Sequence, residues 1–370
     1  MDKGKWYKLT DPKNISSPSL LVYPDRIERN IQRMVAIASD VTRLRPHIKT
    51  HKTREIIMLQ MHYGITKFKC ATIAEAELLG QCGAKDVLLA MQPVGHNIDR
   101  FFTLMKKFPN TKFSTLVDNS RSLRELNGKA KEHDTKISLW IDLNTGMDRT
   151  GIIPDEQAEG LYTLMATLTN VEPMGLHIYD GHIRNTDFSE RKKVCDAAFE
   201  PVLTLKRHIE AKGITVKTIL AGGSPTFPVH AQRNDVELGP GTTLLWDARY
   251  GPLFADMRFE VAAVLITRII SKPAPGLLCF DLGHKSIAPE MEFPRVYIFE
   301  LENSRQISQS EEHLVVACET ADKYAVGDEF YAIPMHICPT VAKYEELLTV
   351  VEGTVTGAWK VAARNQKITI

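Results

Sequence analysis

The first two thirds of the chain alternate between short runs of apolar, β-branched residues and longer stretches that repeat apolar residues at helical spacing. Parallel strands need crossover connections, so this alternation predicts an α/β fold with a parallel sheet. Eight such units fit a (β/α)8 barrel of the TIM type better than an open sheet. The predicted strands cover residues 42–49, 67–72, 86–91, 112–118, 136–143, 171–179, 217–221 and 236–238, and the predicted helices cover 25–39, 54–63, 74–82, 98–108, 120–133, 155–168 and 188–211.

The pattern changes after about residue 250, where helical periodicity disappears and β-rich segments follow one another. We therefore expect a barrel over residues 21–250 and a C-terminal all-β domain over residues 251–370. The run SLLVY at residues 19–23 predicts an isolated strand, and we expect the N-terminal segment, residues 1–20, to pair with the β-domain. The predicted C-terminal strands cover residues 259–271, 277–281, 295–301, 313–318, 329–332, 347–351 and 354–362.

Composition narrows the classes of protein to consider. With 370 residues, 44% hydrophobic and 25% charged, the chain is expected to fold as a globular protein with a large core, which excludes disorder and fibres. The 46 basic and 45 acidic residues are balanced, so we expect neither a nucleic-acid nor a membrane partner. No apolar run approaches the roughly 20 residues of a membrane span, and the N-terminus lacks an apolar signal region. We expect a cytoplasmic protein with a small-molecule substrate.

The octet RPHIKTHK at residues 45–52 concentrates ionisable side chains where a strand is predicted to end. On a strand, His47, Lys49 and His51 would share one face. A lysine at such a position is an ion-pair partner or, when partly desolvated, an amine that attacks carbonyl groups. From the octet alone, a solvated basic loop is the alternative.

Two glycine-rich segments follow the seventh and eighth predicted strands. AGGSPT at residues 221–226 and ELGPGT at residues 237–242 each place glycines and hydroxyls where backbone N–H groups can surround an anion. Barrels of this class commonly bind phosphate there, although either segment alone could be a simple turn. A phosphate site combined with a strand-end lysine suggests pyridoxal 5′-phosphate, whose aldehyde reacts with an amine and whose ring accepts electrons.

The segment PMHICPT at residues 334–340 carries a candidate pair of metal ligands. On an extended segment, His336 and Cys338 would lie on one face and offer an imidazole and a thiolate to a borderline-soft divalent ion. Two protein ligands are too few for a structural site, so water or substrate would complete the shell. A buried histidine and a core cysteine are the alternative.

These motifs, together with SPSLLV, GMDRTG, GLHIYDGH and DLGHK, resemble the fold-type III pyridoxal-phosphate enzymes with an alanine racemase-like barrel. Within that class the chain resembles the D-threonine aldolase and D-serine dehydratase family. The resemblance implies that Lys49 carries the cofactor and that a divalent metal, zinc, manganese or magnesium, is bound beside it. It also implies a homodimer with shared active sites. The residues implied to hold the cofactor are Lys49, Arg149, Tyr179, Gly223, Ser224, Gly241 and Thr242, and those implied to hold the metal are His336 and Cys338.

The resemblance also sets the expected reaction. Alanine racemases carry an arginine where this chain has Gly239, which disfavours a racemase. We predict a lyase for D-β-hydroxy-α-amino acids, of the type that cleaves D-threonine to glycine and acetaldehyde, with Lys49 and His182 as catalytic residues. The alternative is D-serine dehydration to pyruvate and ammonia, favoured by the histidine–cysteine metal pair. A racemase and a non-enzymatic pyridoxal-phosphate protein are further alternatives.

Overall fold

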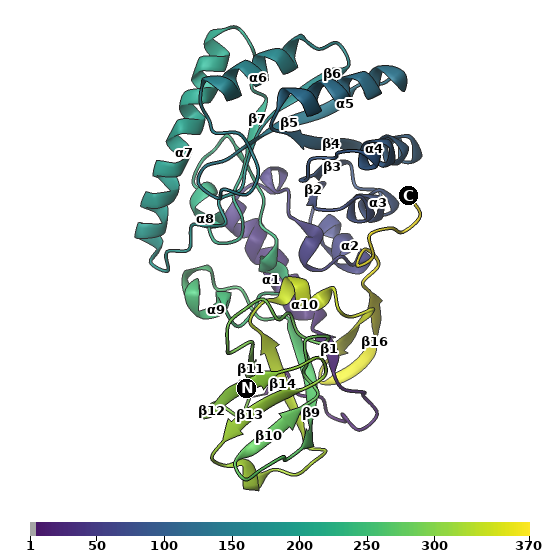
Figure 1. Ribbon diagram of the computed structural model, residues 1–370, viewed down its shortest axis with the longest axis vertical. Coiled ribbons are helices and arrows are strands. Elements are labelled where there is room, and N and C mark those ends of the chain that lie inside the picture. Colours follow the sequence, from purple (N-terminus) through teal and green to yellow (C-terminus); the bar gives the residue numbers. More distant parts are fainter. Residues whose placement is uncertain (1–4) are drawn as a thin grey trace. The chain divides into compact units, whose positions relative to one another are not determined.

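The structure, a computed structural model, describes residues 5–370. The described chain forms two compact units (Figure 1). The barrel unit comprises Arg33–Lys49, Ile57–Gly241 and Asn365–Ile370. The β unit comprises the described residues up to Gln32, Thr50–Ile56 and Thr242–Arg364. Residues 1–4 of the predicted N-terminal segment lie outside the described residues.

The barrel unit contains a parallel sheet of seven strands that pair in chain order, β2 to β8. Its helices lie outside the strands (Figure 1). The strands are β2 (Lys67–Cys70), β3 (Asp86–Leu89), β4 (Lys112–Val117), β5 (Ile137–Leu143), β6 (Val171–Ile178), β7 (Thr218–Ala221) and β8 (Val236–Leu238). The helices are α3 (Ile73–Gln81), α4 (His96–Lys107), α5 (Ser120–Glu132), α6 (Glu156–Thr167), α7 (Phe188–Ala211) and α8 (Phe227–His230), while α1 (Pro24–Ala38) and α2 (Arg54–His62) each belong partly to both units.

Helix caps explain where the helices that follow the strands begin. Thr72 and Asn119 each accept a backbone N–H of the first turn of α3 and α5, and Asp155 and Asp187 do the same for α6 and α7. Such caps satisfy N–H groups that have no partner inside the helix. The helices therefore begin at defined positions beside the strand ends.

The predicted strand at residues 42–49 is wrong. The structure has a 3₁₀ helix at Val41–Arg43, two isolated parallel bridges, and a second 3₁₀ helix at Ile48–Thr50. Pro46 has no N–H to donate, which interrupts a regular ladder. Because the chain coils at Ile48–Thr50, the predicted common face of His47, Lys49 and His51 does not form.

The same segment nevertheless closes the barrel. Arg45 N donates to Leu238 O of β8 at 2.8 Å, and Lys69 N of β2 donates to Pro46 O at 2.9 Å. Residues 44–47 thus link the last strand of the sheet to the first and take the place of an eighth strand. The Arg45 guanidinium, 1% exposed, binds Asp86 at 2.7 and 3.0 Å and Glu237 at 2.8 Å. Arg45 therefore stabilises the closure of the barrel.

The β unit is built on a nine-stranded sheet in which β1 pairs antiparallel with β9 and parallel with β15. Its strands are β1 (Ser19–Val22), β9 (Ala263–Ser271), β10 (Leu277–Phe280), β11 (Val296–Ile298), β12 (Ser304–Gln309), β13 (Leu314–Cys318), β14 (Glu329–Pro334), β15 (Glu346–Val351) and β16 (Thr354–Lys360). Three elements of this unit were not predicted from the sequence: β12, a largely polar edge strand, and the short helices α9 (Tyr250–Leu253) and α10 (Ile337–Val341). The predicted α/β barrel followed by a β-rich unit is otherwise confirmed.

No helix among residues 5–370 is both long enough and apolar enough to cross a membrane.

Candidate active site

Three residues predicted to serve the cofactor come together at the rim of the barrel unit. Tyr179 follows β6, and its ring centroid lies 5.5 Å from Lys49 Nζ and 4.8 Å from Arg149 Cζ. Cations at such distances are attracted to the negative face of an aromatic ring. The side chains of Lys49 and Arg149, which are 100 positions apart in the sequence, therefore contact one ring.

The position of the Tyr179 ring depends on two glycines. A Cβ built on Gly223 would lie 2.9 Å from Tyr179 Cε2, and a Cβ on Gly181 would collide with the Tyr179 hydroxyl. Real Cβ atoms do not approach so closely, so any side chain at either position would push the ring away from Lys49 and Arg149. These glycines keep the ring beside the predicted phosphate loop.

The two glycine-rich segments also meet each other. Ser224 Oγ, after β7, accepts a hydrogen bond from Gly241 N, after β8, at 3.2 Å. Gly222 has φ +84°, in the left-handed region that glycine adopts without strain, and this turn directs the following residues inward. A cradle of backbone N–H groups and a hydroxyl fits a phosphate group. The roles of Gly223, Ser224 and Gly241 in phosphate binding remain predictions.

Asp180 supports this cradle through hydrogen bonds to the first glycine-rich segment. It is 3% exposed, and its carboxylate accepts hydrogen bonds from Thr226 Oγ1 at 2.6 Å and Gly223 N at 3.3 Å. His230 Nε2 lies 2.8 Å from the other carboxylate oxygen. Burial alone would raise the pKa of Asp180, but His230 and Thr226 outweigh it and hold the pKa below 3.8. Asp180 belongs to the GLHIYDGH motif, but this function was not predicted from the sequence.

Cys195 completes a buried group with Asp180 and His230 whose ligand atoms all lie within 4.8 Å of one another. A metal ion could fit that spacing. However, burial raises the pKa of the Cys195 thiol to about 12, and Arg233 contacts His230 Nδ1 at 3.0 Å. A protonated thiol and an adjacent guanidinium disfavour a cation, so we interpret the group as a hydrogen-bonded support for the glycine loop.

The hydrogen bonds of the Asp180 carboxylate give a testable expectation for Asp180→Asn. The amide keeps the shape but loses the charge that the loop and His230 bind, so we expect pyridoxal-phosphate affinity to fall about tenfold, since hydrogen bonds to charged groups contribute about 1.5–3 kcal/mol. Because the pKa of Asp180 lies below 3.8, its contribution to stability is present above that pH and is lost as the pH falls through the lowered value. Fluorescence titration with the cofactor measures the affinity, and the exposed Asp134→Asn is the control. Equal affinities in the two variants would contradict the role of Asp180.

A second, partly buried hydrogen-bond network ends at a ring nitrogen without a hydrogen-bond partner. Gln92 Nε2 donates to Asp118 Oδ2 at 3.0 Å and to Asp142 Oδ2 at 2.9 Å, and Asp142 Oδ1 lies 2.7 Å from His177 Nδ1. Burial lowers the pKa of His177 and the Asp142 carboxylate acts in the opposite direction. The ring is therefore neutral, with Nδ1–H donating to Asp142. Its buried Nε2 has no hydrogen-bond partner. Such an orphan acceptor fits a bound polar ligand.

The other predicted residues of the barrel unit lie as follows. His182 is exposed, and its Nε2 lies 3.1 Å from a Cβ built on Gly146, so its ring rests on the GMDRTG loop. His47 Nδ1 accepts from Lys49 N at 3.2 Å, which fixes the backbone of the predicted cofactor lysine. The catalytic role of His182 stays a prediction.

The candidate metal ligands belong to the β unit. His336 precedes α10 and Cys338 lies in its first turn, so the predicted extended segment is wrong from Ile337 onward. The two side chains still meet, since His336 and Cys338 share a hydrogen bond. Burial would lower the pKa of His336, but Cys338 and Glu290 outweigh it and raise the pKa to about 9. Paired imidazole and thiol groups fit a borderline-soft divalent ion.

Neighbouring side chains position this pair. Glu290 hydrogen-bonds His336 Nδ1, which leaves Nε2 for a metal, the usual arrangement for a ligating histidine. Cys338 Sγ lies 3.1 Å from Thr50 Oγ1 and 3.5 Å from Thr242 Oγ1. Thr50 is the residue that follows Lys49 in the chain. Glu290 was not predicted, because nothing in its local sequence separates it from other surface glutamates.

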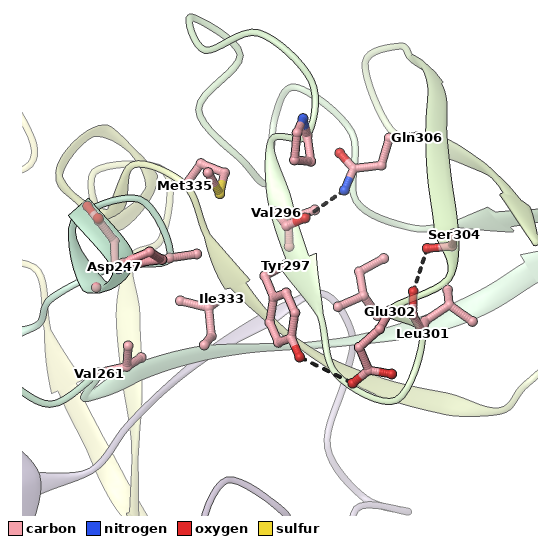
Figure 2. Close-up of a pocket in the computed structure, with 15 residues that line it drawn as sticks. Asp247, Val261, Val296, Tyr297, Leu301, Glu302, Ser304, Gln306, Ile333 and Met335 are labelled. Carbon is pink, nitrogen blue, oxygen red and sulfur yellow. Dashed lines mark hydrogen bonds between the residues drawn. The ribbon is translucent and has the colours of Figure 1, made fainter. Parts of the chain in front are cut away.

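The β unit also has a pocket of about 470 Å³ with a mainly apolar lining (Figure 2). Asp247 and Met335 lie at one end, and Tyr297 bonds Glu302 at the other. Burial raises the pKa of Asp247 to about 6. Asp247 also accepts Ile337 N at 3.3 Å, which fixes the backbone between the two candidate metal ligands.

Comparison with known proteins identifies the family. Residues 22–246 match the family "Alanine racemase, N-terminal domain", and residues 262–350 match the serine dehydratase domain. The chain is 27% identical to 3-hydroxy-D-aspartate aldolase of Paracoccus denitrificans, over 96% of this chain and 94% of the relative. It is 28% identical to D-threonine aldolase of an Arthrobacter species, over 95% of this chain and 93% of the relative. The crystal structure of D-threonine aldolase from Filomicrobium marinum superposes with a TM-score of 0.86, at 26% identity and 95% coverage of each chain.

The chain belongs to the alanine racemase N-terminal domain family, and with it to the fold-type III pyridoxal-phosphate enzymes. Within that class it is a pyridoxal-phosphate-dependent lyase of the aldolase and dehydratase family for D-β-hydroxy amino acids. The predictions of the family, the alanine racemase-like fold and the lyase class are thereby confirmed.

Proposed function

We propose that the protein is a D-threonine aldolase-type lyase that depends on pyridoxal phosphate and a divalent metal. The observation that carries the proposal is the contact of Lys49 and Arg149 with one ring, Tyr179, beside two glycine loops that meet. An amine and a phosphate cradle are the two features that this cofactor requires. The three relatives named above are all aldolases by name, which favours carbon–carbon cleavage over dehydration.

Each residue has a defined task in the proposed reaction. Pyridoxal phosphate supplies an electron sink at Cα, and the divalent ion supplies a Lewis acid at the β-hydroxyl. Lys49 anchors the cofactor through its amine, and Arg149 donates to the phenolic oxygen. His336 and Cys338 would hold the divalent ion. His182 takes the hydroxyl proton as the Cα–Cβ bond breaks.

A dehydratase is the second candidate, because Cys338 rather than a carboxylate accompanies His336. In that reaction Lys49 would remove the Cα proton, and the ion held by His336 and Cys338 would supply the Lewis acid that departure of the hydroxyl needs. Product analysis with D-threonine, D-serine and 3-hydroxy-D-aspartate separates the two. Glycine with an aldehyde supports the aldolase, whereas a 2-oxo acid with ammonia supports the dehydratase and overturns our choice.

Removal of the metal site is expected to abolish activity while the cofactor stays bound. We expect His336→Ala and chelation with EDTA each to lower turnover of D-threonine by about 100-fold or more, because the β-hydroxyl loses its Lewis acid. Visible absorbance of the bound cofactor should not change. His313→Ala, an exposed histidine of the β unit, is the matched control. Full activity after chelation, or in His336→Ala, would exclude the metal role.

We also propose that the protein forms a homodimer. Met91 and Val94 after β3 and Ile153 after β5 are 48%, 58% and 61% exposed, all on loops at the same end of the barrel strands. Exposed apolar side chains in one region are typical of protein–protein contact surfaces. Light scattering after size-exclusion chromatography should give twice the mass of one chain. A monomer at micromolar concentration would contradict this.

A further inference from the structure

Lys69 is a buried amine without a partner. It lies on β2, is 2% exposed, and its Nζ takes part in no hydrogen bond or ion pair with any residue from 5 to 370. Lys67, two positions earlier on the same strand and therefore on the same face, is instead bonded to Glu237. A buried cation with no partner destabilises a fold. Its presence calls for a partner that this chain does not itself provide.

The amine lies against Gly239 in the second glycine-rich segment. A Cβ built on Gly239 would be 2.6 Å from Lys69 Nζ and 3.2 Å from Gly222 O. Gly239 therefore leaves the space that the Lys69 amine fills, two positions before Gly241, whose N–H donates to Ser224. Lys69 thus reaches the same part of the barrel as the predicted phosphate cradle.

The acidic groups near Lys69 do not offset the effects of burial and of the basic groups on its pKa. Burial first, and then the ammonium of Lys49, lower the pKa of Lys69 to about 7; Arg45 acts in the same direction. Asp180 and Asp142 act in the opposite direction without forming a hydrogen bond to it. The charge of Lys69 also acts on His177, whose ring is neutral and whose Nε2 is unpartnered.

We propose that Lys69 is a further cofactor-binding residue, whose ammonium donates a hydrogen bond to an acceptor atom of bound pyridoxal phosphate. This inference rests on the proposed function, in which Lys49 anchors the cofactor. The anionic cofactor supplies the negative partner that the barrel lacks, so binding favours the protonated amine. The acceptor is either a phosphate oxygen or an atom of the pyridine ring.

Proton linkage follows from this assignment. Above about pH 7 the amine is neutral in the apoprotein and charged in the complex, so cofactor binding takes up a proton. Cofactor affinity contributed by Lys69 is therefore fully present below that pH and declines as the pH rises toward the pKa in the complex. Calorimetry at pH 8 in two buffers of different ionisation enthalpy measures the proton uptake.

The test compares Lys69→Met with Lys67→Met, which removes a partnered lysine from the same strand. For Lys69→Met we expect an apoprotein melting temperature equal to or above that of the wild type, because an unpartnered charge is lost. We expect cofactor affinity about tenfold weaker, since one charge-assisted hydrogen bond is lost, and no proton uptake at pH 8. A change in the ³¹P resonance of the bound cofactor assigns the acceptor to the phosphate, and a shift of its visible absorbance assigns it to the ring.

Several results would overturn the inference. Wild-type affinity and proton uptake in Lys69→Met would do so, as would failure of both Lys69→Met and Lys69→Gln to fold, because Lys69 would then have an essential role in the apoprotein. A wild-type protein that takes up no pyridoxal phosphate would instead contradict the proposed function. The two failures are thereby distinguished.

Discussion

Lys49→Ala is expected to abolish covalent cofactor binding and to lower the turnover of D-threonine by about 1,000-fold or more, because no other amine replaces the lost nucleophile. The wild-type protein reconstituted with pyridoxal phosphate should absorb in the visible range, and borohydride should fix the cofactor to the chain. In Lys49→Ala the fixed cofactor should be absent from the intact mass. Residual non-covalent binding is expected, since Ser224 and Gly241 remain in place.

Lys52→Ala is the matched control, because it removes a lysine from the same octet. Lys52 contributes its carbonyl oxygen to Ala363 N, a contact that alanine keeps. We expect this variant to retain covalent cofactor and most of its activity. Borohydride fixation at Lys52, or at Lys69, in place of Lys49 would contradict the account.

Arg45→Met is expected to cause the largest loss of stability. The guanidinium binds Asp86 through two nitrogens and Glu237 through a third, and it is 1% exposed. Methionine would leave Asp86 without its partner at the junction of the first and last strands, while Lys67 still pairs with Glu237. Removing one partner of a buried ion pair costs about 3–5 kcal/mol, and we expect the lower end because Asp86 is 21% exposed. The urea midpoint of unfolding measures the loss.

Arg207→Met on α7 is the corresponding control for a surface ion pair. Arg207 and Glu200 are each 61% exposed, and such pairs contribute about 0–1 kcal/mol. We therefore expect the urea midpoint of this variant to stay close to that of the wild type. An equal midpoint in Arg45→Met would show that residues 44–47 do not depend on this ion pair to close the barrel.

Much of the fold could be predicted because burial imposes regular patterns on the sequence. All seven residues of β5 are buried and all are apolar or small except Asp142, which marks the strand as internal. The segment at residues 42–49 was wrongly predicted as a strand. Pro46 has no N–H to donate, and a 3₁₀ helix forms at Ile48–Thr50. β12 was missed because SRQISQ is an exposed edge strand without apolar alternation.

The candidate site could be predicted where unusual residue types follow a predicted strand. Lys49, Arg149 and the glycine-rich segments are such cases. Supporting residues were not, because their function arises from contacts between distant segments. Asp180 meets Thr226 and His230 only in the folded barrel, and Glu290 meets His336 across 46 positions. Lys69 looked like one more polar residue of a short strand, and only its burial beside Gly239 distinguishes it.

The most direct test of the central claim is to incubate the protein, loaded with pyridoxal phosphate and a divalent metal, with racemic threonine and to follow both enantiomers by chiral chromatography. We predict that D-threonine disappears, that glycine and acetaldehyde appear in equal amounts, and that L-threonine is unchanged. Consumption of L-threonine, interconversion of the enantiomers, or persistence of both would contradict the assignment of a D-specific lyase.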